Sequence, residues 1–359
     1  MTFPFPPRLV LLLGLTLALP ARAQAFADGT PFGGSAVFSE GLDPRSNPAR
    51  FDRVPEGFYL GFEAGDLKPW STSDASDSLR DALTAGDAAA EGRALLRLAA
   101  RPWATRRRAF GLQWAMEGGV RFAYQHEDLR GSRAEVDLAH LGGALGTNGT
   151  QVQGFGATVD RLLAAVGSAA GPSGVGLTAR LERVRSGRED FALVPGAGQA
   201  ALTDPAEALQ GRVRDRSTWT FSTDLGATRE LNDWIRAGLT LDRLLPRRFG
   251  EVNERPQFRA GFQFDLTPLV QFSVEGDLNA AARLPLPQKQ RVLAASLRVE
   301  GLVRVVSFTF GAERRSLEGA RSTLVGAAVH VRTAPLLWSL GLQLGDDRPL
   351  MAGGFRFGR

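Results

Sequence analysis

The sequence of 359 residues contains no cysteine. An exported chain without cysteine cannot form disulfides, so its stability must come from packing or from backbone pairing. Histidine is scarce too: His126, His140 and His330 lie far apart, and none has the spacing of a metal-ligand motif. Nothing selects a serine as a histidine's catalytic partner. We therefore assign no catalytic, cofactor-binding or metal-binding residues and expect a protein that is not an enzyme.

Long apolar runs are also missing beyond the N-terminal region. The one clear run, residues 9–19, follows Arg8 and precedes the Ala-Arg-Ala pattern of residues 21–23, which signal peptidase reads. Its length of about 11 residues is short of the roughly 20 that a membrane-spanning helix needs. We predict a cleaved signal peptide at residues 1–23, with a signal anchor as the alternative, and no helical membrane span after it.

The charge has no long block of one sign. The formal net charge is +5, but arginines and acidic residues are interspersed along the chain. Arg106, Arg107 and Arg108 form the densest basic run, and it stands alone. We interpret that run as a loop or as a cluster at the level of lipid headgroups, and nucleic acid is not an expected partner.

What the sequence does have is alternation of apolar and polar residues, clearest in the C-terminal half. Such alternation puts one apolar and one polar wall on a β-strand. The segments are about 9 to 12 residues long, which suits tilted strands that cross a membrane and exceeds the usual 5 or 6 of globular proteins. Apolar stripes of this kind are Phe258, Ala260, Phe262, Phe264 and Leu266, then Val270, Phe272, Val274 and Leu278, and then Leu336, Trp338, Leu340, Leu342 and Leu344.

The connections between these segments alternate between short and long. Tight turns are expected at residues 334–335, 301 and 267–268 and before Trp234. Longer connections are expected at residues 314–320, 280–289, 244–255 and 186–217. Outer-membrane barrels have short periplasmic turns and longer external loops, so the C-terminus is expected on the periplasmic side.

The first half of the chain is less regular. Residues 73–101 are predicted to form a helical insertion after the first strand, weakened and broken by Gly86 and Gly92. In residues 133–172, Val136 and Leu138 alternate, whereas residues 159–166 fit a helix as well as a strand. All candidates together give an odd count of about 15 strands, and bacterial single-chain barrels have even counts, so about 14 is expected.

Two short motifs precede the first strand: Gly33-Gly34 with small residues after it, and Asn47-Pro48-Ala49. Proline fixes its own φ and restricts the asparagine before it, and the glycines permit close approach to a barrel wall. The pair of motifs resembles the N-terminal hatch of the fatty-acid transporter FadL superfamily, which includes PorV and TraF-type proteins. The resemblance, closest to the TraF-type branch of conjugal transfer, implies a 14-stranded barrel with this hatch in its lumen; an ordinary turn is the alternative.

Charged residues occupy the polar faces of the predicted strands. Charges of both signs inside a barrel can pair across strands and lock it, or they can line a polar passage. We favour the first interpretation. The residues expected to line the lumen are Arg180, Glu182, Asp224, Arg259, Asp265, Glu275, Asp277, Arg298 and Glu300.

The sequence therefore predicts an all-β protein of the outer membrane, in contact with its lipid. Residues 24–56 are expected to form a plug and residues 57–359 a closed antiparallel transmembrane β-barrel. The expected function is transport of small molecules, hydrophobic ones included, or a role in a secretion or conjugation apparatus. A lipid-modifying barrel enzyme and a soluble periplasmic β-protein stay open as alternatives.

Overall fold

A computed structural model describes the parts of the chain that build the barrel and its contents. The described residues are 47–53, 56–65, scattered positions between 82 and 96, 103–135, 151–192, 217–250, 252–284, 286–301, 305–317, 320–333, 336–344 and 350–357. The predicted signal peptide, Gly33, Gly34 and His140 lie outside these residues. Within them, no helix is long and apolar enough to cross a membrane.

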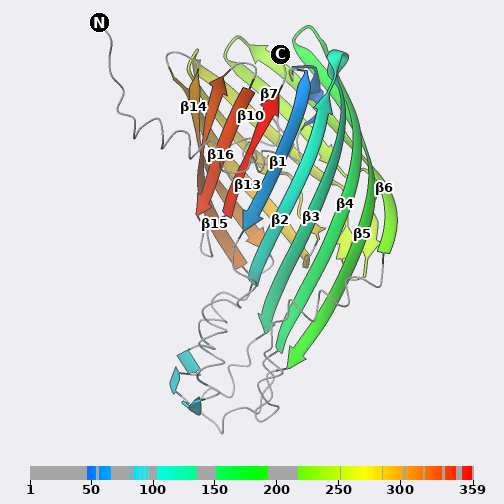
Figure 1. Cartoon of the computed structure of the whole chain (residues 1–359), viewed down its shortest axis with the longest axis vertical. Coiled ribbons are helices and arrows are strands. Elements are labelled where there is room, and N and C mark those ends of the chain that lie inside the picture. The colour runs from blue at the N-terminus through cyan, green and yellow to red at the C-terminus, as the bar shows by residue number, and fades with distance from the viewer. Residues whose placement is uncertain are drawn as a thin grey trace, which may run out of the picture.

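Fourteen strands form one closed antiparallel barrel, as the sequence predicts (Figure 1). Strands adjacent in the ring pair with each other, β1 pairs with β17, and the pairing of β11 with β13 completes the circle. The ring strands are β1 (Gly57–Gly65), β2 (Trp103–Ala115), β3 (Val120–Glu135), β4 (Gln151–Ala170), β5 (Ser173–Ala192), β6 (Ser217–Asn232), β7 (Ile235–Asp242), β10 (Gln257–Thr267), β11 (Val270–Asp277), β13 (Leu286–Glu300), β14 (Val306–Leu317), β15 (Ala320–Thr333), β16 (Leu336–Leu344) and β17 (Leu350–Phe357).

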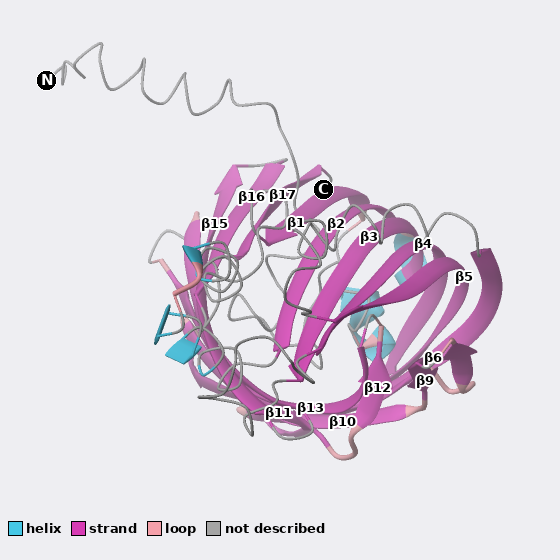
Figure 2. Cartoon of the chain, turned by 90° about the horizontal axis from the view of Figure 1, so that it is seen from below, coloured by secondary structure: helices cyan, strands magenta, loops and turns pink. Residues whose placement is uncertain are grey.

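Five shorter elements complete the described structure. The 3-10 helix η2 (Pro48–Arg53) precedes β1, and η3 (Glu117–Gly119) forms the turn between β2 and β3. Strands β8 (Arg247–Phe249) and β9 (Val252–Glu254) form a hairpin between β7 and β10. Strand β12 (Ala281–Arg283) pairs with the start of β13. In the view from the lower end of the barrel, β9 and β12 lie near β6 and β10 (Figure 2).

The two faces of the barrel wall have opposite character. On β10, Phe258, Phe262 and Leu266 are exposed on the outside, whereas Arg259 and Gln263 are buried on the inside. The same division runs around the ring, with large apolar side chains outside and polar side chains inside. A bilayer interior has no water to hydrogen-bond an unpaired strand edge, and a closed barrel has no such edge. Its apolar outer face is suited to contact with lipid, so this architecture suits a membrane.

The two ends of the barrel differ in the length of their connections. At the end that holds the C-terminal residues of β17, the turns are residues 116–119, 171–172, 233–234, 268–269, 301–305 and 334–335. We call this the turn end. Connections at the opposite, loop end are longer, and β3, β4 and β5 project furthest in that direction (Figure 1). One expected long connection is wrong: between β14 and β15 only residues 318–319 intervene.

Two further expectations need correction. Residues 159–166 lie within β4, so the helical alternative is wrong. Both faces of this part of β4 carry apolar residues because its inner face packs against η2 and the hairpin instead of lining an open lumen, which hides the alternation. Arg106, Arg107 and Arg108 lie within β2 and not in a loop.

The predicted helical insertion is described only in part, and no complete helix is described there. Ala82, Ala85, Ala89 and Ala90 are helical, and Gly86 interrupts them with a φ of +68°. The amide of Asp87 donates to the carbonyl of Ala82, as in a helix end closed by a left-handed glycine. The carboxylate of Asp87 then accepts bonds from the amides of Ala89 and Ala90, both at 3.0 Å, and caps the next turn. The helical conformation is therefore interrupted at Gly86, as predicted, whereas Gly92 is helical and does not interrupt it.

Candidate functional site inside the barrel

The inward residues of strand β5 contact each of the structures inside the lumen in turn. Its inward residues, counted from the turn end, are Gly174, Gly176, Thr178, Arg180, Glu182 and Val184. The first two contact the segment before β1, the next charged pair enters an ion-pair network, and Val184 contacts the hairpin. The plug, the network and the hairpin therefore follow one another along a single wall of the barrel.

The plug motif lies inside the barrel, with Asn47 and Ala49 only 0% and 2% exposed. The Asn47 amide nitrogen donates to the backbone oxygens of Ala227 on β6, at 3.1 Å, and Leu239 on β7, at 3.3 Å. Its side-chain oxygen accepts the amide of Ala49 at 3.0 Å. This geometry uses both amide donors and the side-chain oxygen, so Asn47 starts η2 and at the same time ties it to the wall.

Glycines form the seat of the plug. Gly167, Gly176 and Gly226 lie directly opposite one another on β4, β5 and β6. A Cβ atom at Gly176 would lie 2.2 Å from the backbone carbon of Pro48, and one at Gly226 would lie 1.9 Å from the side-chain oxygen of Asn47. Real side chains essentially never come this close, so the plug can sit here only because these positions lack a Cβ.

The hairpin of β8 and β9 enters the lumen from the loop end of the barrel. It belongs to the connection between β7 and β10, yet Phe249 and Val252 are each only 5% exposed. Phe249 packs with Leu129, Ala157 and Val184 on the inner faces of β3, β4 and β5. Complete burial of a phenylalanine side chain contributes about 1.5–3 kcal/mol. This loop is therefore folded into the lumen and packs against β3, β4 and β5.

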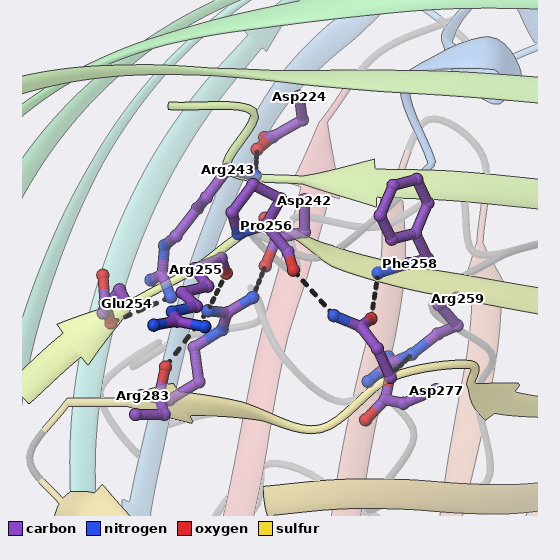
Figure 3. Close-up of polar contacts among 12 residues, drawn as sticks. Asp224, Asp242, Arg243, Glu254, Arg255, Pro256, Phe258, Arg259, Asp277 and Arg283 are labelled. Atoms are coloured by element: carbon purple, nitrogen blue, oxygen red, sulfur yellow. Dashed lines mark hydrogen bonds and ion pairs between the residues drawn. The ribbon is translucent and has the colours of Figure 1, made fainter. Parts of the chain in front are cut away.

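Ion pairs fix the base of the hairpin (Figure 3). Glu254, which is fully buried, accepts a bond from Arg243 at 3.0 Å, as Figure 3 shows. It also accepts bonds from Arg247 at 2.6 Å and from the amide of Leu284 at 3.1 Å. Burial acts to raise the pKa of Glu254, but Arg243, Arg247 and Arg283 outweigh it and lower the pKa to about 2. Arg247 also pairs with Glu182 on β5, so the network joins the hairpin to a strand that is not adjacent to β7 or β10.

Six of the nine predicted lumen residues lie in the buried interior. These six are Arg180, Glu182, Asp224, Arg259, Glu275 and Asp277. Arg180 pairs with Asp224 and, at 3.2 Å, with Asp242, and Arg259 pairs with Asp277 at 2.8 Å and Glu275 at 3.6 Å. Most of these contacts join neighbouring strands, and the one between Arg180 and Asp242 joins β5 to β7 across β6. This is the arrangement expected of charges that lock the wall.

The other three predicted lumen residues lie near the turn end and are partly exposed. Asp265 pairs with Arg236 at 3.1 Å, and Arg298 pairs with Glu300 at 3.4 Å. Their side chains are between 21% and 39% exposed, so these pairs contribute less to stability than the buried ones. They are not part of the network at the hairpin.

The hairpin was not predicted from the sequence. A signal for it exists: Gly250, with a φ of +58°, follows Phe249, and the flanking positions pair Phe249 with Val252 and Arg247 with Glu254. This is the pattern of a short antiparallel pair around a glycine turn. The glycine seat was also missed, because Gly174 and Gly176 contact residues more than a hundred positions earlier in the chain.

The two described histidines, His126 and His330, do not build a catalytic site at the lipid-facing wall. His330 is buried inside the barrel, where its Nδ1 lies 2.7 Å from the Ser339 hydroxyl and its Nε2 lies 3.2 Å from Thr309. On the outer face, the Nδ1 of His126 lies 2.8 Å from Asp160, and no described serine hydrogen-bonds to His126. Within the described part of the chain, no group of histidines and carboxylates could hold a metal ion.

Comparison with known proteins gives the fold a precedent. No family model matches the sequence, and no curated protein matches it. Among solved structures, the Pseudomonas putida toluene transporter TodX is 10% identical with a TM-score of 0.54, covering 95% of this chain and 99% of its own. The CymD monoaromatic hydrocarbon channel is 10% identical with a TM-score of 0.52, covering 94% and 97%. At this identity the likeness shows the fold alone, and it gives no support to the conjugal-transfer branch of the resemblance.

Proposed function

We propose that this protein is an outer-membrane channel for small apolar molecules, closed at rest by the plug segment Asn47–Ala49. The seat of that segment on Gly176 and Gly226 is the observation that carries the proposal. A channel wall that lacks side chains at the positions where an internal segment rests is suited to a segment that can leave and return. Two side-chain hydrogen bonds from Asn47, each worth about 0.5–1.5 kcal/mol net, tie the plug to β6 and β7, and η2 also packs against β4, β5 and β6.

The contents of the lumen argue against a wide pore for hydrophilic solutes. Eight-stranded barrels are filled by their own side chains, whereas barrels of roughly 16 to 18 strands leave an aqueous channel. A barrel of fourteen strands needs further contents to be closed, and here the hairpin and the plug supply them. The ion pairs of Glu254 hold the hairpin in place.

The substrate class rests on the likeness to TodX and CymD, whose names describe a toluene transporter and a monoaromatic hydrocarbon channel. Apolar molecules of that size would need only a narrow path past the plug. The apolar outer belt keeps the protein in the bilayer, where such molecules also dissolve.

The test is uptake into vesicles that contain the purified full chain. Radiolabelled toluene and a labelled disaccharide should be supplied to the same preparation, with protein-free vesicles as the reference for passive entry. We expect protein-dependent entry of toluene and none of the disaccharide. Disaccharide entry at the rate of toluene would show an open pore and reject the proposed substrate class.

A further inference from the structure

Three arginines gather on the outer face of the barrel at its loop end. Arg291 on β13, Arg314 on β14 and Arg321 on β15 are all exposed, and we call them the rim arginines. Arg291 lies opposite Ser316, which lies opposite Arg321, and Arg314 lies opposite Leu293. The three cations therefore come from adjacent strands at neighbouring levels (Figure 1 labels these strands).

No carboxylate balances the rim arginines among the described residues. The carboxylates nearest to them are engaged elsewhere: Glu313 on β14 pairs with Arg315, and Asp277 on the neighbouring strand β11 pairs with Arg259. The Nε of Arg291 donates to the backbone oxygen of Asp277 at 2.6 Å, so the two terminal nitrogens of its guanidinium stay available. Arg314 and Arg321 form no ion pair with any described residue.

An apolar groove lies directly below the rim arginines on the lipid-facing surface. It has a volume of about 630 Å³, and Phe262, Val274 and Leu293 line it together with the rim arginines. Glu275 and Asp277 also belong to its lining, but both are buried and both pair with Arg259. Gly276 lies among them, and a Cβ there would lie 3.2 Å from the flexible end of Leu293 and 3.6 Å, an ordinary contact distance, from the backbone oxygen of Val292. A groove of this kind, walled by apolar side chains and facing the bilayer, fits an acyl chain.

We propose that the rim arginines and this groove bind one lipid A moiety of lipopolysaccharide, with a phosphate on the arginines and an acyl chain in the groove. Arginine binds phosphate through charge-assisted, bidentate hydrogen bonds. Longer connections mark the external end of an outer-membrane barrel, so the rim arginines lie at the external leaflet. The phosphorylated lipid of that leaflet in a Gram-negative outer membrane is lipopolysaccharide.

The other side of the barrel provides a contrast at the same end. Arg185 on β5 also lies on the outer face, but it pairs with Asp160 at 3.7 Å. Tyr124 and His126 bond to the same carboxylate. Arginines here are interleaved with acidic residues, so this face does not present the uncompensated positive charge of the rim arginines.

The test measures binding of defined lipids to the full chain in detergent by native mass spectrometry. The probes are bis-phosphorylated lipid A, its monophosphorylated form and phosphatidylglycerol. For the double variant R314Q/R321Q we expect lipid A to bind about 25-fold more weakly. That is about fivefold for each arginine, or about 1 kcal/mol each. The matched control R185Q should change binding less than twofold.

A second variant tests the groove with the charges intact. G276L fills the groove and should weaken binding of lipid A, while an unchanged unfolding temperature confirms that the barrel is folded. Unchanged affinity in R314Q/R321Q would overturn the proposal. Equal affinity for phosphatidylglycerol and lipid A would overturn the assignment to lipopolysaccharide. These outcomes are independent of toluene uptake, because the proposed lipid lies outside the lumen.

Discussion

The substitution G176A should unseat the plug without disturbing the barrel. The new Cβ would lie 2.2 Å from the backbone carbon of Pro48 and 2.3 Å from its oxygen. Backbone atoms cannot rotate away, so the plug must retreat by at least about 1 Å to reach ordinary contact distance. The Asn47 bonds to Ala227 and Leu239, now 3.1 and 3.3 Å long, would then exceed hydrogen-bond length.

Loss of those two bonds costs about 1–3 kcal/mol, which shifts the ratio of seated to released plug by about 5- to 150-fold. The assay is single-channel recording in planar bilayers, where we expect the open fraction to rise within that range. The control is G276A on β11, whose Cβ would lie 3.2 Å from the flexible end of Leu293 and 3.6 Å from the backbone oxygen of Val292. If G176A and G276A record the same open fraction, the glycine seat does not hold the plug closed.

Three further outcomes follow from the same contacts. N47A removes both bonds to the wall and should raise the open fraction as G176A does; an unchanged open fraction would assign the hold to packing alone. E254Q leaves Arg243 and Arg247 buried without their carboxylate, a loss of about 3–5 kcal/mol, so protease should cut the hairpin in E254Q but not in the exposed-site control R248A. Because the pKa of Glu254 is lowered to about 2, its contribution to stability is complete above the usual carboxyl value of about 4.3 and is lost as the pH falls toward 2. The unfolding temperature followed by tryptophan fluorescence should therefore fall between about pH 4 and 2, and an equal fall in E254Q would exclude Glu254 as the cause.

The strands of the barrel wall could be predicted from the sequence because the alternation of apolar and polar residues within each strand identifies its outer and inner faces. Phe258 and Phe262 alternate with Arg259 and Gln263 whatever the neighbouring strands are, and burial follows that alternation. The rule that bacterial single-chain barrels have an even number of strands then reduced the count of candidates from about 15 to about 14. The strand at residues 159–166 stayed ambiguous because the plug and the hairpin cover its inner face.

The contents of the lumen depend on contacts between distant parts of the chain, and a single sequence does not report them. Gly174 and Gly176 look like an ordinary weak glycine pair until Pro48 and Ala49 are placed against them. Glu254 looks like a loop carboxylate, although it is buried between Arg243 and Arg247. Arg180 and Asp224, which the sequence places on polar faces, pair with each other in the structure, whereas the inward fold of the hairpin was not foreseen.

The most direct test of the proposed gate is a covalent lock on the plug. The chain has no cysteine, so A49C/T228C contains only the two introduced thiols. The Ala49 backbone oxygen and the Thr228 hydroxyl both lie within 3 Å of the point where a Cβ at Gly174 would stand, so the two positions are neighbours. A short bis-alkylating reagent such as dibromobimane should join them and abolish toluene uptake, while the unlinked protein keeps it. Undiminished uptake by the fully linked protein would contradict the plug as the gate.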